Sequence, residues 1–300
     1  MTTETVSPTG AQWLAGARPR TLPAAAAPVL AASGLAHLAG RFGAAAALLA
    51  LVVSVALQVG VNYANDYSDG IRGTDADRVG PLRLVGSGLA RPVAVKRAAF
   101  AAFGVAGVAG LALVLLTGHE WLLAVGAVCV LAAWYYTGGR TPYGYLGLGE
   151  VAVFVFFGLV AVGGTYYVQV GSVSPAAVLT GAWVGALACV ILVANNLRDL
   201  RGDAATGKRT LATRLGDRGT RRLFVGLVLG AGVLVAVVAA LTTPWALLGL
   251  AGLLLAVPAC RRVLDGASGP ALVSVLKSTG TTELACAVAF ALGLALAAAR

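Results

Sequence analysis

Long apolar runs separated by short polar segments make up most of this chain. A helix that crosses the hydrocarbon core of a bilayer needs about 20 predominantly apolar residues. Nine segments approach or reach that length: residues 21–40, 43–65, 94–117, 120–137, 148–170, 174–197, 221–241, 244–260 and 275–299. The pattern predicts an all-α polytopic membrane protein with nine transmembrane helices, and the Ala and Gly in these runs favour close helix packing.

Composition places the chain in the same class. Of its 300 residues, 59% are hydrophobic and 11% are charged, and the mean hydropathy is +0.86, which is typical of membrane proteins. We expect residues 1–300 to form one transmembrane domain, in which 1–17 are a polar tail without the pattern of a cleaved signal. The four cysteines lie singly in apolar runs, so neither a disulfide framework nor a cysteine metal site is expected.

The basic residues are distributed unevenly between the two sides of the predicted membrane. With nine spans, all but two of the 22 Lys and Arg residues fall on the side of the N-terminus, the exceptions being Arg41 and Arg300. The positive-inside rule therefore predicts a cytoplasmic N-terminus, an outer C-terminus and two long cytoplasmic loops, about 66–93 and 198–220. Topology and anionic headgroups then explain the net charge of +10, and no nucleic-acid partner is expected.

Both long loops open on a similar acidic pattern. The leading Asn–Asp pairs share one offset of 133 residues, and the recurring residues are Asn62, Asp66 and Asp69, then Asn195, Asp199 and Asp203. If the preceding helices continue through these residues, each presents two carboxylates on one face, because residues three or four apart are neighbours. The alternative is that the aspartates are ordinary loop residues that offset nearby arginines.

Paired carboxylates that face each other across a central cavity suit a hard divalent cation. Mg²⁺ takes oxygen ligands and is usually held by one or two carboxylates plus substrate phosphates. We therefore predict that Mg²⁺ is bound by the four aspartates of the two clusters, Asp66, Asp69, Asp199 and Asp203. Asp75 and Asp77 follow the first cluster and are secondary candidates.

Two further segments carry cations suited to phosphate. The segment "GKRT" places Lys208 and Arg209 beside a flexible glycine, and such side chains bind phosphate oxygens. The spacing is not that of a P-loop. Arg140 is the only cation of the predicted loop that follows the fourth span, so we expect it to contact phosphate as well.

The segment "WYYTGGRTPYGYLGLGE" contains this arginine. Tyr136 and Arg140 stand four residues apart at the predicted end of a helix, and Glu150 begins the next helix. Gly-Gly and Pro predict a turn between them. Trp134, Tyr143 and Tyr145 are either part of the site or aromatic residues of the membrane interface.

The motifs together resemble the UbiA superfamily of intramembrane aromatic prenyltransferases. The resemblance is closest to the branch that acts in menaquinone synthesis, and it extends over nearly the whole chain. The stretches that carry it are "ARPRTLPAAAAPVL" (17–30), "NYANDYSDGIRGTD", "GPLRLVGSG" (80–88), "YYTGGRTPYGYLGLGE" and "NNLRDLRGDAATGKRTLATRLG" (195–216). One departure is that the Y-x3-K motif of the family appears as Tyr136-x3-Arg140.

The resemblance implies a fold, a reaction and a set of site residues. The fold is a bundle of nine transmembrane helices, and the reaction transfers a polyprenyl chain from its diphosphate to 1,4-dihydroxy-2-naphthoate with loss of the carboxylate. The four aspartates become catalytic Mg²⁺ ligands. The implied substrate-binding residues are Asn62, Asn65, Asn195, Asn196, Lys208, Arg209, Arg140, Tyr136, Arg18, Arg20 and Glu150. Arg18 or Arg20 either holds the acceptor carboxylate or only anchors the cytoplasmic side.

Three alternatives remain at this level. "DYSDG" resembles the start of the motif of CDP-alcohol phosphotransferases, but "IRGTDADRVG" does not continue it. A transporter with an acidic mouth is disfavoured because transporters place polar groups near the bilayer midplane, whereas these charges lie at one face. Within the superfamily, other members prenylate 4-hydroxybenzoate, homogentisate, haem or glycerol phosphates, so the acceptor rests on the resemblance alone.

Overall fold

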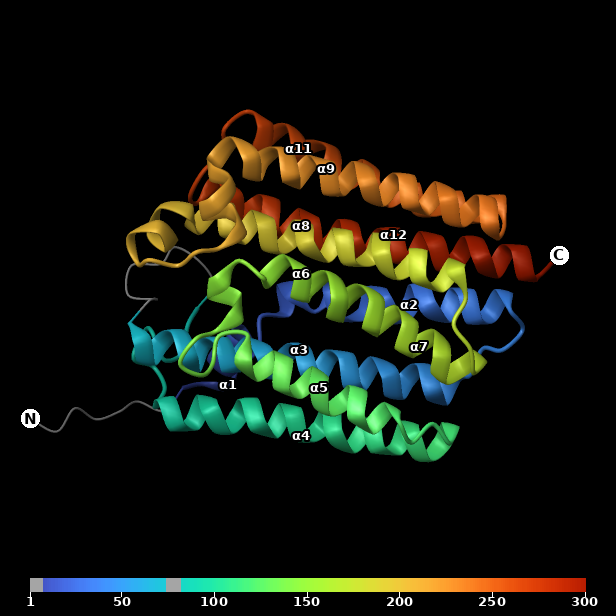
Figure 1. Cartoon of the computed structure of the whole chain (residues 1–300), viewed down its shortest axis with the longest axis horizontal. Coiled ribbons are helices and arrows are strands. Elements are labelled where there is room, and N and C mark those ends of the chain that lie inside the picture. The colour runs from blue at the N-terminus through green and yellow to red at the C-terminus, as the bar shows by residue number, and fades with distance from the viewer. Residues whose placement is uncertain (1–7, 74–81) are drawn as a thin grey trace, which may run out of the picture.

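The computed structural model describes residues 8–73 and 82–300, and within these ranges the chain is helical without strands. Long helices lie side by side and run between two ends of the molecule (Figure 1). In chain order the helices are α1 (Gly10–Gly16), α2 (Pro23–Leu38), α3 (Ala44–Arg72), α4 (Pro92–Thr117), α5 (Leu122–Tyr135), α6 (Gly149–Val153), α7 (Ala161–Val170), α8 (Pro175–Ala205), α9 (Leu211–Leu241), α10 (Gly249–Leu253), α11 (Val257–Leu264) and α12 (Ala271–Ala298). The all-α prediction is confirmed.

Shorter helical segments connect or continue these helices. The 3-10 segments are η1 (Pro19–Thr21), η2 (Tyr143–Leu146), η4 (Pro244–Leu248) and η5 (Leu254–Ala256), and η3 (Phe154–Val160) is a π-helix between α6 and α7. Because α6, η3 and α7 follow one another without a break, they form one continuous run, Gly149–Val170.

Seven helices or continuous runs in the described residues are long and apolar enough to cross a membrane. An eighth is added if Gly10–Thr21 and Pro23–Leu38, which meet at a bend of 48°, count as one span. The predicted span at 120–137 corresponds to α5, which has only 14 residues. The described helices therefore supply seven or eight candidate spans, and the number nine stays a prediction.

The helices extend further than the predicted loop boundaries. α3 continues to Arg72 and α8 to Ala205, and α9 begins at Leu211, so residues 66–72 of the first predicted loop and most of 198–220 are helix. A helix bonds its own backbone groups, so it can continue beyond the apolar run into polar surroundings. α3 ends where Gly73 takes the left-handed conformation with φ of 70°, as is common at helix C-termini.

Glycine allows the helices at the centre of the bundle to approach closely. A Cβ added to Gly158 in η3 would lie 2.4 Å from the Gly181 carbonyl oxygen and 2.6 Å from the Gly185 Cα, both in α8. Any larger side chain at Gly158 would therefore meet backbone atoms of the neighbouring helix. Such contacts between small residues provide the packing that holds helices together where the hydrophobic effect between them is weak.

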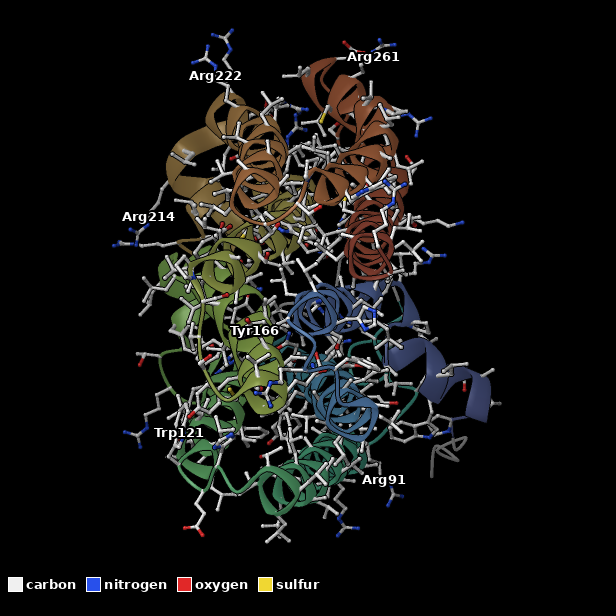
Figure 2. The ribbon with its side chains drawn as sticks, turned by 90° about the vertical axis from the view of Figure 1, so that its right-hand side faces the viewer. Arg91, Trp121, Tyr166, Arg214, Arg222 and Arg261 are labelled. Carbon is white, nitrogen blue, oxygen red and sulfur yellow. The ribbon has the colours of Figure 1, made fainter. Side chains whose placement is uncertain are left out.

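The two ends of the molecule differ in what they carry. The described N-terminal segment and the C-terminal ends of α3 and α8 lie at one end, and the C-terminus of the chain lies at the other (Figure 1). Around the bundle, Arg91, Arg214, Arg222 and Arg261 are exposed and project outward (Figure 2). The end that carries the α3 and α8 C-termini is the one with the predicted site residues.

Candidate functional site

The two acidic clusters lie on the last turns of two long helices. Asp66 and Asp69 are on the last two turns of α3, and Asp199 and Asp203 are on the last two turns of α8. The segment between α5 and α6 lies at the same end of the molecule (Figure 1). The helices thus continue through both pairs of aspartates, which is the condition under which each helix presents two carboxylates on one face.

Asp66 binds the chain that follows the first acidic cluster. It is 1% exposed, and its Oδ2 and Oδ1 accept hydrogen bonds from the backbone N–H groups of Leu84 at 2.7 Å and Val85 at 3.1 Å. Gly70, one turn later, lets this segment approach, because a Cβ there would lie 2.4 Å from Val85 Cγ1. Asp66 thus holds the residues around 84 against α3, a structural contact that the sequence pattern did not indicate.

Asp69 is bound by groups from two other segments. Its Oδ1 accepts a hydrogen bond from the Tyr145 hydroxyl in η2, and its Oδ2 lies 3.6 Å from an Arg83 guanidinium nitrogen. Arg72 donates to the backbone carbonyls of Thr137 and Gly139. The end of α3 is therefore tied to the segment between α5 and α6.

The second cluster is paired with cations. Arg198 donates to both oxygens of the Asp199 carboxylate, at 2.7 and 2.8 Å, and the Lys208 ammonium lies 3.8 Å from Asp203 Oδ1. The same Lys208 nitrogen lies 4.5 Å from the centroid of the Tyr145 ring. Contacts through Tyr145 and Lys208 therefore connect the cluster on α3 with the cluster on α8.

Asn62 and Asn65 on α3 make structural hydrogen bonds. Asn62 Nδ2 donates to the Ala17 carbonyl at 2.9 Å and to Thr21 Oγ1 at 3.0 Å, so it fixes the N-terminal segment against α3. Asn65 Oδ1 accepts from the Thr137 hydroxyl at 2.7 Å. Both amides position chain segments at the site.

The two asparagines on α8, Asn195 and Asn196, differ from each other in their contacts. Asn196 Nδ2 donates to Glu150 Oε1 at 2.9 Å, which joins α8 to the start of α6 and explains how the buried Glu150 is accommodated. Asn195 Nδ2 donates to the Ile191 carbonyl of its own helix at 3.1 Å. The two clusters therefore share a sequence pattern but not a pattern of contacts.

The remaining predicted cations lie around these helix ends. Arg18 takes a left-handed conformation with φ of 55°, and its charge, like that of Arg83, acts on Asp66. Arg20, Arg140 and Arg209 are exposed. The structure thus brings Arg18 toward the first cluster and leaves these three at the surface.

Tyr136 follows α5 and packs edge-on against Tyr143, with ring centroids 5.5 Å apart. The Tyr143 hydroxyl donates to the Ala132 carbonyl at 2.7 Å, and burial raises the pKa of this phenol to about 12. Tyr143 is therefore a neutral donor that fastens η2 to α5. Tyr136 is therefore half-buried against Tyr143, whereas Arg140 is exposed.

The carboxylates of the two acidic clusters are suitable metal ligands, but each cluster has too few of them to bind a metal ion without a substrate. No group of three or more His, Cys, Asp or Glu side chains lies close enough for metal binding in residues 8–73 and 82–300. Two carboxylates at each helix end match the usual Mg²⁺ arrangement, in which phosphate and water complete the coordination. Asp75 and Asp77 lie outside the described residues.

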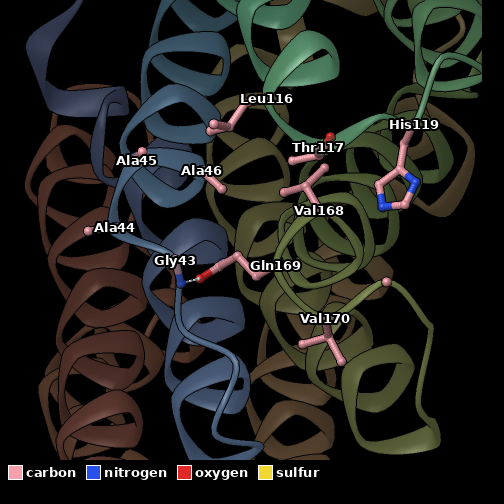
Figure 3. Close-up of a pocket in the computed structure, with 11 residues that line it drawn as sticks. Gly43, Ala44, Ala45, Ala46, Leu116, Thr117, His119, Val168, Gln169 and Val170 are labelled. Carbon is pink, nitrogen blue, oxygen red and sulfur yellow. Dashed lines mark hydrogen bonds between the residues drawn. The ribbon is translucent and has the colours of Figure 1, made fainter.

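Two surface hollows lie away from the acidic clusters. One of about 500 Å³ is lined by the ends of α3, α4 and α7 and the turns beside them, among them Gly43, Thr117, His119 and Gln169. Gln169 Oε1 accepts from Gly43 N at 3.3 Å (Figure 3). The other, of about 470 Å³, lies between α3 and α4 and is apolar. Neither is lined by a residue of the two clusters, so the central cavity stays a prediction.

Three residues of structural interest were not singled out for these contacts by the sequence pattern. Tyr145 is one of three aromatic residues that the sequence assigns either to the site or to the membrane interface, and Arg198 lies in the same NNLRD stretch as Asp199. An arginine at the end of an apolar run is the signal that would have pointed to Arg198. Glu283 is the third, a carboxyl group within the apolar run of the last helix.

Glu283 is completely buried in α12, and neither of its carboxyl oxygens has a hydrogen-bond partner in the described residues. An unsatisfied buried polar group costs about 1–3 kcal/mol. Glu283→Met keeps the length of the side chain and removes the polar atoms, so we expect it to stabilise the protein by about 1–3 kcal/mol. Thermal unfolding in detergent measures this.

The matched control for this variant is Glu150→Met. Glu150 is also buried, but it accepts from Asn196, so its removal leaves a partner unsatisfied and is expected to destabilise by about 1–3 kcal/mol. Opposite shifts of the two melting temperatures are predicted. Equal destabilisation by both would show that Glu283 has a partner as well.

Comparison with known proteins identifies the family. The model of the UbiA prenyltransferase family matches residues 22–271, which is most of the chain and includes both acidic clusters. The chain belongs to the UbiA prenyltransferase family.

Individual UbiA relatives are similar over nearly their full length. The 1,4-dihydroxy-2-naphthoate octaprenyltransferase of Mycobacterium tuberculosis is 54% identical over 95% of this chain and 97% of its own length. The protein of the same name in Escherichia coli is 37% identical over 99% of this chain and 98% of its own length.

Solved structures share the UbiA fold at low sequence identity. A UbiA homolog from Archaeoglobus fulgidus bound to DMAPP and Mg²⁺ is similar with a TM-score of 0.62 and 14% identity, over 95% of this chain and 99% of that chain. The apo structure of a UbiA homolog from Aeropyrum pernix K1 has a TM-score of 0.69 and 16% identity, over 92% and 97% of the two chains. These similarities support the UbiA fold seen here.

Proposed function

We propose that this chain transfers a polyprenyl group from polyprenyl diphosphate to 1,4-dihydroxy-2-naphthoate with loss of the carboxylate, giving demethylmenaquinone. The choice of acceptor is supported by the two relatives named 1,4-dihydroxy-2-naphthoate octaprenyltransferase. One structural observation carries the reaction class: α3 and α8 each present two aspartates at one end of an apolar bundle, with Lys208 between the clusters. Carboxylates and a cation together suit a metal-bound diphosphate.

The basic side chains of the site bind the diphosphate in this proposal. Lys208, Arg209 and Arg140 contact its oxygens and stabilise the charge that develops as it leaves. Asp66, Asp69, Asp199 and Asp203 would hold Mg²⁺, which the Archaeoglobus fulgidus homolog binds together with DMAPP. Mg²⁺, when bound, supplies positive charge that makes the diphosphate a better leaving group.

The apolar interior of the bundle protects the reactive prenyl group. Departure of the diphosphate creates an allylic cation, which water would capture, so the site must exclude water. The interior faces of α8 and its neighbours are lined by residues such as Val184, Leu187 and Val190, all buried. The prenyl tail lies in this apolar interior or in the lipid, while the charged diphosphate stays at the polar end.

The acceptor carboxylate needs a cation near the first cluster. Arg18 is the better placed of the two N-terminal arginines, because its charge acts on Asp66 whereas Arg20 is exposed. Asn62 fixes the adjacent segment through the Ala17 carbonyl and Thr21. We assign Arg18 to the acceptor and Asn62 to the positioning of Arg18.

The proposal includes a topology for the cell membrane. α5 is taken as a short ninth span, in addition to the seven long runs and the bent pair of α1–η1 and α2. With nine spans the N-terminus and the acidic clusters face the cytoplasm and the C-terminus faces outward, which follows the positive-inside rule. Cysteine labelling from either side of intact cells, at Thr9 and Arg300 each replaced by cysteine, tests this orientation.

An acceptor screen tests the assigned reaction. Purified protein with Mg²⁺ and a polyprenyl diphosphate is expected to prenylate 1,4-dihydroxy-2-naphthoate and not 4-hydroxybenzoate or homogentisate. Mass spectrometry of the product should show a prenyl group gained and the carboxylate lost. A product that keeps the carboxylate would refute the decarboxylating route, and turnover only with another acceptor would refute the assignment of naphthoate.

A further inference from the structure

Tyr145 in η2 contacts three groups of the site at once. Its hydroxyl donates to Asp69 Oδ1, its ring centroid lies 4.5 Å from the Lys208 ammonium, and its backbone carbonyl accepts from Arg209 N at 3.0 Å. The Arg72 guanidinium lies 5.6 Å from the same ring. One residue thus touches the first acidic cluster through its hydroxyl and the cations next to the second cluster through its ring and backbone.

The segment around Tyr145 is fastened from both sides, so these contacts are not those of a free surface residue. Arg214 donates to the Leu146 carbonyl at 2.8 Å, and Gly144 N donates to the Tyr136 carbonyl at 3.0 Å. Gly147 has φ of 78°, and a Cβ there would lie 3.0 Å from the Arg209 carbonyl oxygen. The glycine is needed both for the left-handed turn and for the close approach of the two segments.

We infer that Tyr145 is a positioning residue that couples the two acidic clusters. Its hydroxyl orients the Asp69 carboxylate, and its ring face and carbonyl hold Lys208 and Arg209 where the diphosphate binds. The inference rests on the proposed function, in which Asp69 binds a divalent cation and the two basic residues bind the diphosphate. It adds Tyr145 of η2 to the residues that bind or position ligands beside the two acidic clusters on α3 and α8.

The two parts of the side chain are expected to act on different ligands. A hydrogen bond that orients a metal ligand typically changes metal affinity by about 10–100-fold, so loss of the hydroxyl should weaken metal binding. A cation over an aromatic face is attracted by the ring, an effect of about 2- to 30-fold in affinity, so loss of the ring should release Lys208 and weaken diphosphate binding. Tyr145→Phe removes the first contact only, and Tyr145→Leu removes both.

The experiment measures metal binding apart from turnover. Full-length protein in detergent is titrated with Mn²⁺ in the presence of a non-reactive prenyl thiodiphosphate, and bound Mn²⁺ is followed by electron paramagnetic resonance. Tyr145→Phe is expected to raise the Mn²⁺ dissociation constant about tenfold with little change in the apparent affinity for the analogue. Tyr145→Leu is expected to raise both. In turnover assays the same variants should show a higher Mg²⁺ requirement, and Tyr145→Leu also a higher KM for the prenyl diphosphate.

Tyr143→Phe is the matched control. It lies two residues away in the same 3-10 segment, and its hydroxyl bonds the Ala132 carbonyl instead of an acidic side chain. It is expected to lower thermal stability slightly and to leave Mn²⁺ binding unchanged. If Tyr145→Phe binds Mn²⁺ like the wild type, or if Tyr143→Phe weakens it equally, the coupling role is refuted while the proposed function stands. If the wild-type protein binds no Mn²⁺ with the analogue, the proposed metal site and this inference are refuted together.

Discussion

Asp199→Asn is expected to lower the rate of prenyl transfer on the order of 1000-fold. The neutral amide keeps the shape of the side chain. In the native protein Arg198 donates to both oxygens of the Asp199 carboxylate, and in the variant the one amide oxygen can still accept from it. It no longer supplies the negative charge that a divalent cation needs. Single-turnover assays with radiolabelled polyprenyl diphosphate in membranes measure the loss.

Asp217→Asn is the matched control for this prediction. Asp217 is an aspartate near the start of α9 that is paired with Arg221 at 2.6 Å, but its side chain is 53% exposed and it belongs to neither cluster. Its replacement should leave turnover within about twofold, because exposed ion pairs contribute little. Retained activity in Asp199→Asn would remove the second cluster from the metal site.

Asp66→Asn is a less direct test of the same site. The two oxygens of the Asp66 carboxylate accept hydrogen bonds from two backbone N–H groups. Asparagine has only one side-chain oxygen, so it can accept only one of these hydrogen bonds in the same way. A loss of activity in this variant would combine loss of charge with displacement of the residues around Leu84. At Asp199 the partner is the side chain of the adjacent Arg198 and not the backbone of another segment, so Asp199→Asn gives the cleaner measurement.

Gly158→Ala is expected to destabilise the protein by about 3 kcal/mol, the upper end of the usual cost of overpacking. The added Cβ would lie 2.4 Å from the Gly181 carbonyl oxygen and 2.6 Å from the Gly185 Cα. Both are backbone atoms of a long helix, which cannot rotate aside as a side chain can. Thermal unfolding in detergent, with the yield of folded protein, measures the effect.

Gly163→Ala in α7 is the same substitution in an open position. A Cβ there has no neighbour within 4 Å among the described residues. Because Ala favours a helix over Gly by up to about 1 kcal/mol, this variant should be neutral or more stable. A loss of stability equal to that of Gly158→Ala would show that the close helix contact is not the cause.

Local regularities explain what could be predicted from sequence. The all-α class follows from the length of the apolar runs, because a chain in lipid must bond its backbone internally. The placement of Asp66 with Asp69, and of Asp199 with Asp203, on single helix faces follows from helical periodicity. Both features involve residues that are neighbours in the chain, so no long-range packing had to be known.

The wrong loop boundaries and the contacts that the sequence did not indicate both reflect features that hydrophobicity and spacing do not report. Loop boundaries were placed where hydrophobicity falls, near residues 66 and 198, but α3 continues to Arg72 and α8 to Ala205. Hydrophobicity reports the surroundings of a helix, whereas its end is set by backbone bonding and by residues such as Gly73. The two Asn–Asp patterns also differ in their contacts, because Asn62 binds the N-terminal segment whereas Asn195, 133 residues later, donates to a carbonyl of its own helix.

The sequence by itself determined the membrane class, the helical fold and the presence of two acidic helix ends, because each depends on composition or on spacing within one segment. Only the tertiary structure decided which groups these aspartates meet. Asp66 accepts hydrogen bonds from the backbone N–H groups of Leu84 and Val85, which lie 18 and 19 residues later in the chain. Asp69 accepts a hydrogen bond from Tyr145, which lies 76 residues later. Such contacts depend on how segments that are distant in the chain pack against one another. At Gly70 and Gly147 the absence of a side chain allows a neighbouring segment to approach closely, and a local sequence pattern does not predict that packing.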